Sequence, residues 1–183
     1  MPPQSQPKPA ATPGIPPPRV NAAGKSELWI AASVGDVAKV RSLLAAPGGS
    51  LLVNLQAKDG ASPLFAACMY GHTEVVCALL SGGAKVDLLI KELGSPLHAA
   101  CHSGHMGAVL ALLSAGAKVN LQTTAGMTPL HAACYCGHME VARALLSGGP
   151  RSTWSPPMVI HPCIRYAIGA TRRWSATCYL LGP

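Results

Sequence analysis

A seven-residue phrase that returns at a near-constant spacing is the feature that most constrains how this chain can fold. Thr128–Cys134 reads TPLHAAC, Ser95–Cys101 precedes it by 33 residues, and Ser62–Cys68 lies a further 33 residues back. A less similar copy, Ser26–Ala32, lies 36 residues before that. A glycine follows every copy at the same offset, namely Gly35, Gly71, Gly104 and Gly137. A fixed period of this size is typical of a solenoid, in which one small unit repeats and stacks on its neighbours.

The phrase predicts the start of a short helix. Its Ser or Thr is suited to the N-cap, where the side-chain oxygen accepts a hydrogen bond from a backbone N–H two or three residues on. Proline at the next position has no N–H to leave unpaired and a preset φ. His98 and His131 then fall at the third helical position, within reach of the capping hydroxyl. The glycine suits a left-handed C-terminal turn, so we expect a helix of about two turns.

These residues resemble the ankyrin repeat. The resemblance covers residues 24–149 in four units, at about 24–56, 57–89, 90–122 and 123–149. Glycine–histidine pairs end the first helix of three units, and leucine pairs close the second helices: Leu79-Leu80, Leu112-Leu113 and Leu145-Leu146. The resemblance implies an all-α ankyrin-repeat solenoid of stacked helix-turn-helix units, with short β-hairpin connections between them.

Two units depart from the common pattern. The first carries Trp29 where later copies have Phe or His, as a terminal capping unit does, and it has extra residues near Pro47–Gly49, where we expect a surface loop. The hairpin of the third unit reads Leu88–Leu93 where its neighbours are polar, and its turn glycine is shifted to Gly94. Either the turn is irregular and partly self-buried, or an apolar contact patch is formed by Leu89, Ile90 and Leu93.

The segments that flank the units differ in composition. Residues 1–23 contain eight prolines, so we expect a disordered or polyproline-II tail. Residues 150–183 form a basic, non-repeat C-terminal tail with four arginines and no acidic residue, which suits an alternative end to a longer array. No fifth copy follows the fourth unit, so its outer face lacks a polar cap of its own.

Charge and cysteine content narrow the functional classes. Residues 26–149 hold seven basic and seven acidic side chains, so the net charge of +7 comes from the flanks and a nucleic-acid face is not expected. No apolar run approaches the ~20 residues that span a bilayer, and the N-terminus has no signal-peptide core. The seven cysteines have no secretory context, which predicts free thiols in an intracellular, cytoplasmic protein, with a nuclear location left open.

The histidines and cysteines invite a metal or catalytic interpretation, but the repeat phase accounts for most of them. Cys68, Cys101 and Cys134 occupy the same position of the repeated phrase, next to its alanines, where the neighbouring helix requires a small side chain. A histidine regularly follows the turn glycine. Only His102 and Cys136 lie outside these columns. The sequence therefore predicts no metal, no cofactor and no enzyme activity, because neither four converging zinc ligands nor an acidic orienter for a nucleophile is placed.

The two variable positions before each turn glycine are the candidate contact surface. On the resemblance they line the concave groove of the solenoid: Met69, Tyr70, His102, Ser103, Tyr135 and Cys136. Tyr and Met are enriched in protein interfaces. We therefore predict a monomeric adaptor or scaffold that binds another protein through this groove and the hairpins, with no catalysis.

Two alternatives stay open. Ankyrin arrays often carry a C-terminal box of the suppressor-of-cytokine-signalling type, and Met158, Val159, Cys163 and Ala167 faintly resemble its elongin-binding spacing, which would suit a substrate-recognition subunit of a ubiquitin ligase. Pro162 would interrupt the helix that such a box needs. The other is modification: Asn120 resembles the asparagine that ankyrin repeats present for hydroxylation.

Overall fold

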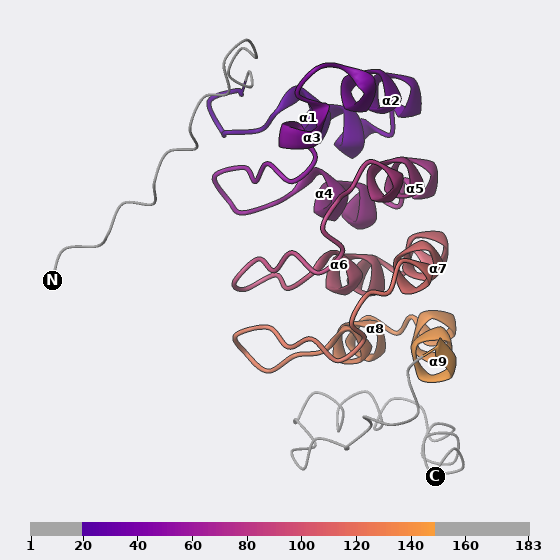
Figure 1. Cartoon of the computed structure of the whole chain (residues 1–183). Coiled ribbons are helices and arrows are strands. Elements are labelled where there is room, and N and C mark those ends of the chain that lie inside the picture. Colours follow the sequence, from indigo (N-terminus) through magenta and orange to yellow (C-terminus); the bar gives the residue numbers. More distant parts are fainter. Residues whose placement is uncertain (1–19, 149–183) are drawn as a thin grey trace, which may run out of the picture.

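Four helix pairs stack in sequence order to form the solenoid (Figure 1). The structure, a computed structural model, describes residues 20–148. The first helices of successive pairs contact one another, and so do the second helices, which gives two parallel columns. The pairs are α1 Glu27–Val34 with α2 Val37–Ala45, α4 Pro63–Tyr70 with α5 Thr73–Ser81, α6 Pro96–Ser103 with α7 Met106–Ser114, and α8 Pro129–Tyr135 with α9 Met139–Gly148. The expected all-α solenoid is confirmed.

The repeated phrase forms the first helix of each pair as expected. The Ser62 hydroxyl accepts a hydrogen bond of 3.1 Å from the backbone N–H of Phe65, and the proline after it occupies the first turn of α4. Gly71 then ends the helix with a left-handed φ of 77°. Since a residue with a side chain pays a steric cost in that conformation, the recurring glycine is a backbone requirement.

The core is aliphatic and alanine-rich because the helices approach closely. Leu64, Leu97 and Leu112 are at most 1% exposed, and the alanines of the first helices are buried with them. Cys68 on α4 and Cys101 on α6 are fully buried, at positions where the close approach of the next helix leaves room only for a small side chain. Burying each leucine contributes roughly 1.5–3 kcal/mol, so repetition along the stack supplies a core that no single unit holds alone.

The connections between units have the outline of hairpins but little strand structure. They project as loops on one side of the first helices (Figure 1). Ile90 and Gly94 exchange two backbone hydrogen bonds of 2.8 Å and form a single β-bridge. In the neighbouring loops the equivalent return bond is absent, because Gly60 and Gly126 donate within the turn to Ala57 and Thr123. The described residues therefore contain hairpin-shaped turns without β-strands.

The extra residues of the first unit are ordered differently from the surface loop expected there. They form a short helix, α3, at Gly49–Leu52. Gly49 is buried, and a Cβ at this position would lie 2.6 Å from the carbonyl oxygen of Leu43. The backbone of the insertion thus packs directly on the end of α2, which only a glycine permits. Trp29 is buried in the same unit, with the Lys25 Nζ 3.7 Å above its ring.

Candidate functional site

The last turns of the first helices expose side chains where the rest of each helix is buried. Tyr70 at the end of α4 is 55% exposed and Tyr135 at the end of α8 is 67% exposed, and His102 near the end of α6 is exposed as well. Their neighbours Met69, Ser103 and Cys136 are half-buried. We call Tyr70, His102 and Tyr135 the first-helix strip.

Histidines from the following unit bind backbone carbonyl groups near the ends of two first helices. The His138 Nε2 lies 3.1 Å from the carbonyl oxygen of His102, and the His72 Nε2 lies 3.1 Å from that of Ser33. A carbonyl oxygen only accepts, so in both contacts Nε2 carries the proton and donates it. Each hydrogen bond crosses from one unit to the next. The backbone of His102 in the strip is therefore held by a side chain of the fourth unit.

The half-buried members of the predicted set fill space between units. The Ser103 hydroxyl donates to the Met69 Sδ at 3.5 Å, which joins α6 to α4. The Tyr70 ring lies beside the imidazole of His72 with 6.5 Å between the ring centroids. Met69 and Ser103 thus support the strip from within the stack, whereas the exposed area comes from the three larger side chains.

The prediction that Ile90 forms part of an exposed patch is wrong. Leu89 and Leu93 are 45% and 54% exposed, but Ile90 is only 8% exposed. Ile90 packs towards the preceding loop, where a Cβ on Gly60 would lie 3.3 Å from its Cγ2. Both explanations of this hairpin apply in part, because Ile90 is self-buried while Leu89 and Leu93 face outwards.

The turn glycine of the third hairpin, Gly94, lies close to the ring of His98. Gly94 has a left-handed φ of 83°, and a Cβ there would lie 2.6 Å from the His98 ring. Leu93 consequently takes the tip position that Gly60 holds in the preceding loop. Leu93 therefore stands exposed at the tip and Gly94 follows it.

Two groups of residues were missed by sequence reasoning. The first unit contributes the same two positions before its turn glycine, and Val34 there is 67% exposed. Val34 directly precedes Gly35, as Tyr70 precedes Gly71, and this spacing could have identified Val34 from the sequence. The other group ties successive units together: the Asn54 Oδ1 accepts a 2.7 Å hydrogen bond from the backbone N–H of Lys85, and Asp87 accepts one of 3.1 Å from Lys118. Asn120 is the next member of this column and is exposed.

His98 lies in a buried hydrogen-bond network at the start of α6. Its Nε2 donates to the carbonyl of Met127 at 3.0 Å, and its Nδ1 accepts from the backbone N–H of Ser95 at 3.1 Å. The Ser95 hydroxyl is 2.9 Å from the same Nδ1, as the capping prediction requires. Burial lowers the pKa of His98 below its ordinary value, although the bond to Met127 opposes this. The neutral ring that results is a structural link between the third and fourth units.

The buried cysteines are equally structural. Burial raises the pKa of the Cys68 thiol far above its ordinary value, and it raises the pKa of Cys101 to about 12. A cysteine nucleophile needs the thiolate, which burial in this column disfavours. Nowhere among residues 20–148 do three His, Cys, Asp or Glu side chains gather closely enough to hold a metal ion.

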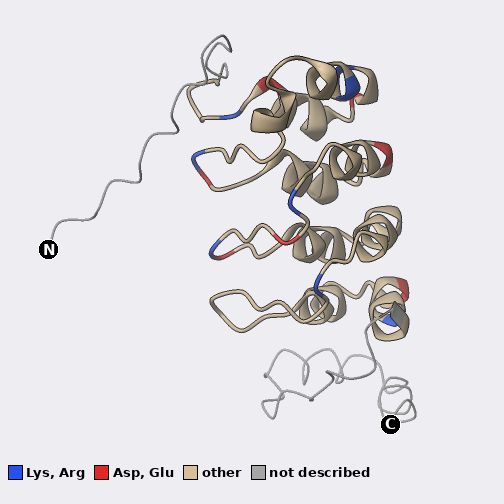
Figure 2. Cartoon of the chain, viewed as in Figure 1, with Lys and Arg blue, Asp and Glu red and all other residues tan. Residues whose placement is uncertain are grey.

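Charged side chains are sparse and mixed in sign on the described part of the chain (Figure 2). Lysines at the loops alternate with acidic residues, and the exposed Arg143 lies 3.4 Å from Glu140 on α9. None of the helices in this part combines the length and the apolar character that crossing a bilayer requires.

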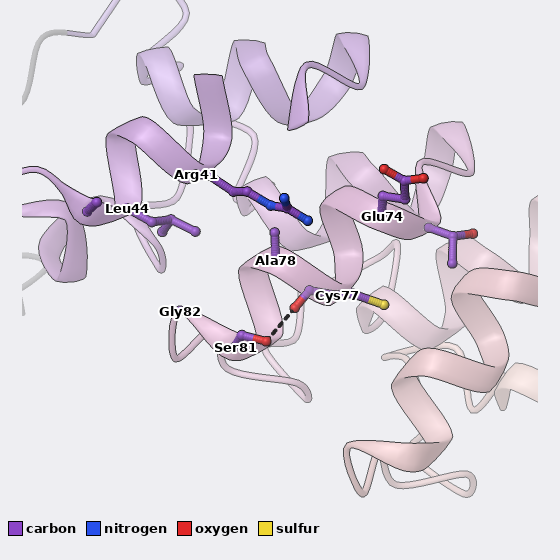
Figure 3. A pocket seen from close by; sticks show the side chains of 9 residues that line it. Arg41, Leu44, Glu74, Cys77, Ala78, Ser81 and Gly82 are labelled. Atoms are coloured by element: carbon purple, nitrogen blue, oxygen red, sulfur yellow. Dashed lines mark hydrogen bonds between the residues drawn. The ribbon is translucent and has the colours of Figure 1, made fainter. Parts of the chain in front are cut away.

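A shallow depression of about 550 Å³ lies on the outer side, between α2 and α5 (Figure 3). Arg41 reaches into it from α2, and Glu74 and Cys77 line it from α5. The Ser81 hydroxyl donates to the Cys77 carbonyl at 3.0 Å, so it is engaged with its own helix. The residues that line the depression include Glu74 and no histidine.

Comparison with known families agrees with this architecture. The family model described as ankyrin repeats (3 copies) matches residues 16–90 and 82–153, which is well over half of the chain. A comparison with curated proteins finds no match. The chain belongs to the ankyrin-repeat family, whose repeats generally serve as protein–protein interaction modules.

Proposed function

We propose that the chain is an adaptor or scaffold that binds a partner protein through the first-helix strip and the tip of the third hairpin. The observation that carries this proposal is the exposure of Tyr70, His102 and Tyr135 at the ends of successive first helices, with the backbone of His102 held by His138 of the next unit. A side chain held on rigid backbone loses little entropy on binding, and tyrosine buries a large contact area at low entropic cost. The strip thus has the composition of a binding surface, and its central residue His102 sits on backbone held by the next unit.

The third hairpin extends this surface with apolar side chains. Leu89 and Leu93 are exposed where the other units have glutamine and glycine at the equivalent positions. Exposed leucines cost solubility unless a partner covers them. We place the partner across the strip and this hairpin, while Met69, Ser103 and Cys136 support it from the half-buried positions.

The proposed adaptor performs no chemistry and acts as an intracellular, cytoplasmic monomer. The free thiols support an intracellular location, because Cys68 and Cys101 are buried without a disulfide and Cys77 is an exposed free thiol. Near-neutral charge on the units supports a protein partner over a nucleic acid.

Site-specific photo-crosslinking tests the proposal. A photo-reactive amino acid at His102 or Tyr135 should capture a partner from cell extract, and mass spectrometry should identify the same protein from both positions. The matched control places the probe at Glu74, which is exposed on the outer side of α5. Capture from Glu74 with none from His102 and Tyr135 would assign the binding face to the second helices.

Modification of Asn120 is a second proposal. Asn120 is exposed in the connection between the third and fourth units. An increase of one oxygen in the mass of the peptide that spans Asn120 would support hydroxylation, and an unmodified peptide from the cellular protein would exclude it. The residues of the ligase alternative, Met158 to Ala167, lie outside the described part of the chain.

A further inference from the structure

In every unit one of the two positions before the turn glycine is exposed and the other is half-buried. Tyr70, His102 and Tyr135 of the first-helix strip are the exposed residues in three units, and Val34 holds this place in the first unit. Successive first helices contact one another, so equivalent positions lie ~10 Å apart, the distance between the axes of packed helices. The four units therefore offer one contact each along a line of about 30 Å.

This spacing distinguishes between the backbone conformations that a partner could present. An α-helix rises 1.5 Å per residue, so seven residues cover about 10.5 Å and return to nearly the same face of the helix. An extended strand places every second residue on one face, about 6.6 Å apart. Three extended residues also cover about 10 Å, but the side chain at the end of that step points to the opposite face. One contact per unit thus matches a helix laid along the stack.

The backbone near the strip offers little for an extended partner to pair with. The carbonyl oxygen of His102 is already bound by the next unit. Between residues 20 and 148, β pairing is limited to two isolated bridges, Val20 with Ser26 and Ile90 with Gly94, so that part of the chain has no strand edge to which a segment could add. A helical partner needs no such edge, because its backbone groups bond to one another.

The charges around the strip complement an amphipathic helix. The strip itself contains no Lys, Arg, Asp or Glu. The hairpins beside the first helices carry exposed neighbours of opposite charge, Lys58 with Asp59 and Lys91 with Glu92 (Figure 2). A helix with an apolar stripe and charges of both signs along its flanks has the matching pattern, and the two exposed leucines of the third hairpin widen the apolar contact.

We propose that the partner presents an amphipathic α-helix of about three heptads, laid along the stack with one contact per heptad on successive units. This inference rests on the proposed function, because it concerns the occupant of the same surface. The contacting side of the helix carries apolar or aromatic residues seven positions apart. One end of the helix lies at Val34 and the other at Tyr135.

Crosslink mapping on the full-length chain tests the helix. Single variants carry a photo-reactive amino acid at Tyr70, His102 or Tyr135, and mass spectrometry identifies the partner residue that each one reaches. That residue should advance by about seven positions from one unit to the next, always in the same direction.

Other outcomes of the mapping separate this inference from the proposed function. An advance of about three positions per unit would identify an extended segment. Partner residues without a common step would identify a surface built from several segments. Either result would overturn the helix and leave the proposed function in place. Failure to capture any partner from the strip would reject the proposed function, and the helix with it.

A proline variant of the captured partner supplies a second measurement, by isothermal titration calorimetry with the full-length chain. Proline in the middle of the captured segment, between two crosslinked residues, should weaken binding on the order of a hundredfold, because it breaks the interior of a helix. Alanine at the same position is the matched control and should bind as the unchanged partner does, since alanine favours a helix. Binding of the proline variant within about threefold of the alanine variant would overturn the helix.

Discussion

The imidazole of His138 stands directly against the Cα of Gly104, so that a Cβ on the glycine would lie 2.5 Å from the ring Nδ1. Gly104 and Gly137 end equivalent helices with left-handed φ values of 74° and 76°, but nothing lies within 4 Å of a Cβ on Gly137. Alanine variants at these two positions therefore separate the cost of a left-handed backbone from the cost of displacing the ring. The glycine–histidine pairs of successive units interlock across the stack, and the last glycine has no ring against it among the described residues.

Gly104→Ala should cost more stability than Gly137→Ala. Both alanines must adopt the left-handed conformation, which costs about 1–2 kcal/mol. Gly104→Ala must also displace the His138 ring, which adds roughly 1–3 kcal/mol of overpacking. Urea unfolding of the two variants and the wild type measures the difference, and equal losses would show that the ring moves aside freely.

The stability contributed by neutral His98 should fade in acid. Because burial lowers its folded pKa, the unfolded chain binds the proton first, near the ordinary value of about 6.5. The contribution is complete above that pH and is lost as the pH falls towards the lower folded pKa. His98→Phe, which copies Phe65 of the second unit, removes the titration and leaves the Met127 carbonyl unpaired, at a cost of roughly 1–3 kcal/mol near pH 8.

The measurement is the difference in unfolding free energy between wild type and His98→Phe at several pH values. The wild-type advantage should shrink as the pH is lowered from 8 to 5, since only the wild type pays to keep a buried ring neutral. A difference that is independent of pH would mean that His98 titrates alike in both states.

Thiol labelling should separate the cysteines by position. Cys77 on the outer side of α5 is exposed, while Cys68 and Cys101 are buried with raised pKa values. Brief treatment of the native protein with a maleimide should modify Cys77 and leave the other two intact until denaturant is added. Peptide mass spectrometry reads each site, and comparable native labelling of Cys68 would contradict the closed first-helix column.

Asn54→Ala should weaken the link between the first and second units. Its Nδ2 donates to the Gly83 carbonyl at 3.2 Å and its Oδ1 accepts from Lys85 at 2.7 Å, so the variant loses two hydrogen bonds. We expect a loss of about 1–2 kcal/mol in unfolding free energy. Gln122→Ala, at an exposed loop position, is the control and should stay within about 0.5 kcal/mol of the wild type.

The sequence predicted the features that depend on contacts near in the chain. Capping by Ser62 and the turn at Gly71 follow from residues within one unit, and both are confirmed. The sequence left open whether the third hairpin buries its own apolar residues, and the helical insertion at Gly49 was not foreseen, because each depends on a neighbour brought close by folding.

The candidate contact surface shows the same limit of prediction from sequence, at the level of single residues. The repeat phase located the two positions before each glycine but not which of the two faces outwards. Tyr70 is the second of its pair, whereas His102 and Tyr135 are the first of theirs. Which residue of each pair is exposed depends on packing between units, such as the contact of Ser103 with Met69. The bonds from Asn54 and Asp87 were missed for a related reason, since their partners lie 31 residues away.

The most direct test of the proposed binding surface compares two double variants for affinity towards the crosslinked partner, by isothermal titration calorimetry. Tyr70→Ala with Tyr135→Ala removes the exposed aromatics of the strip, and Arg41→Ala with Arg143→Ala changes the second helices, with circular dichroism confirming that all variants fold. Truncating a central aromatic at an interface commonly costs 2 kcal/mol or more, so the tyrosine pair should bind at least about thirtyfold more weakly. The arginine pair should bind as the wild type does. Normal binding by the tyrosine pair, together with loss of binding by the arginine pair, would place the interface on the outer face and contradict the proposal.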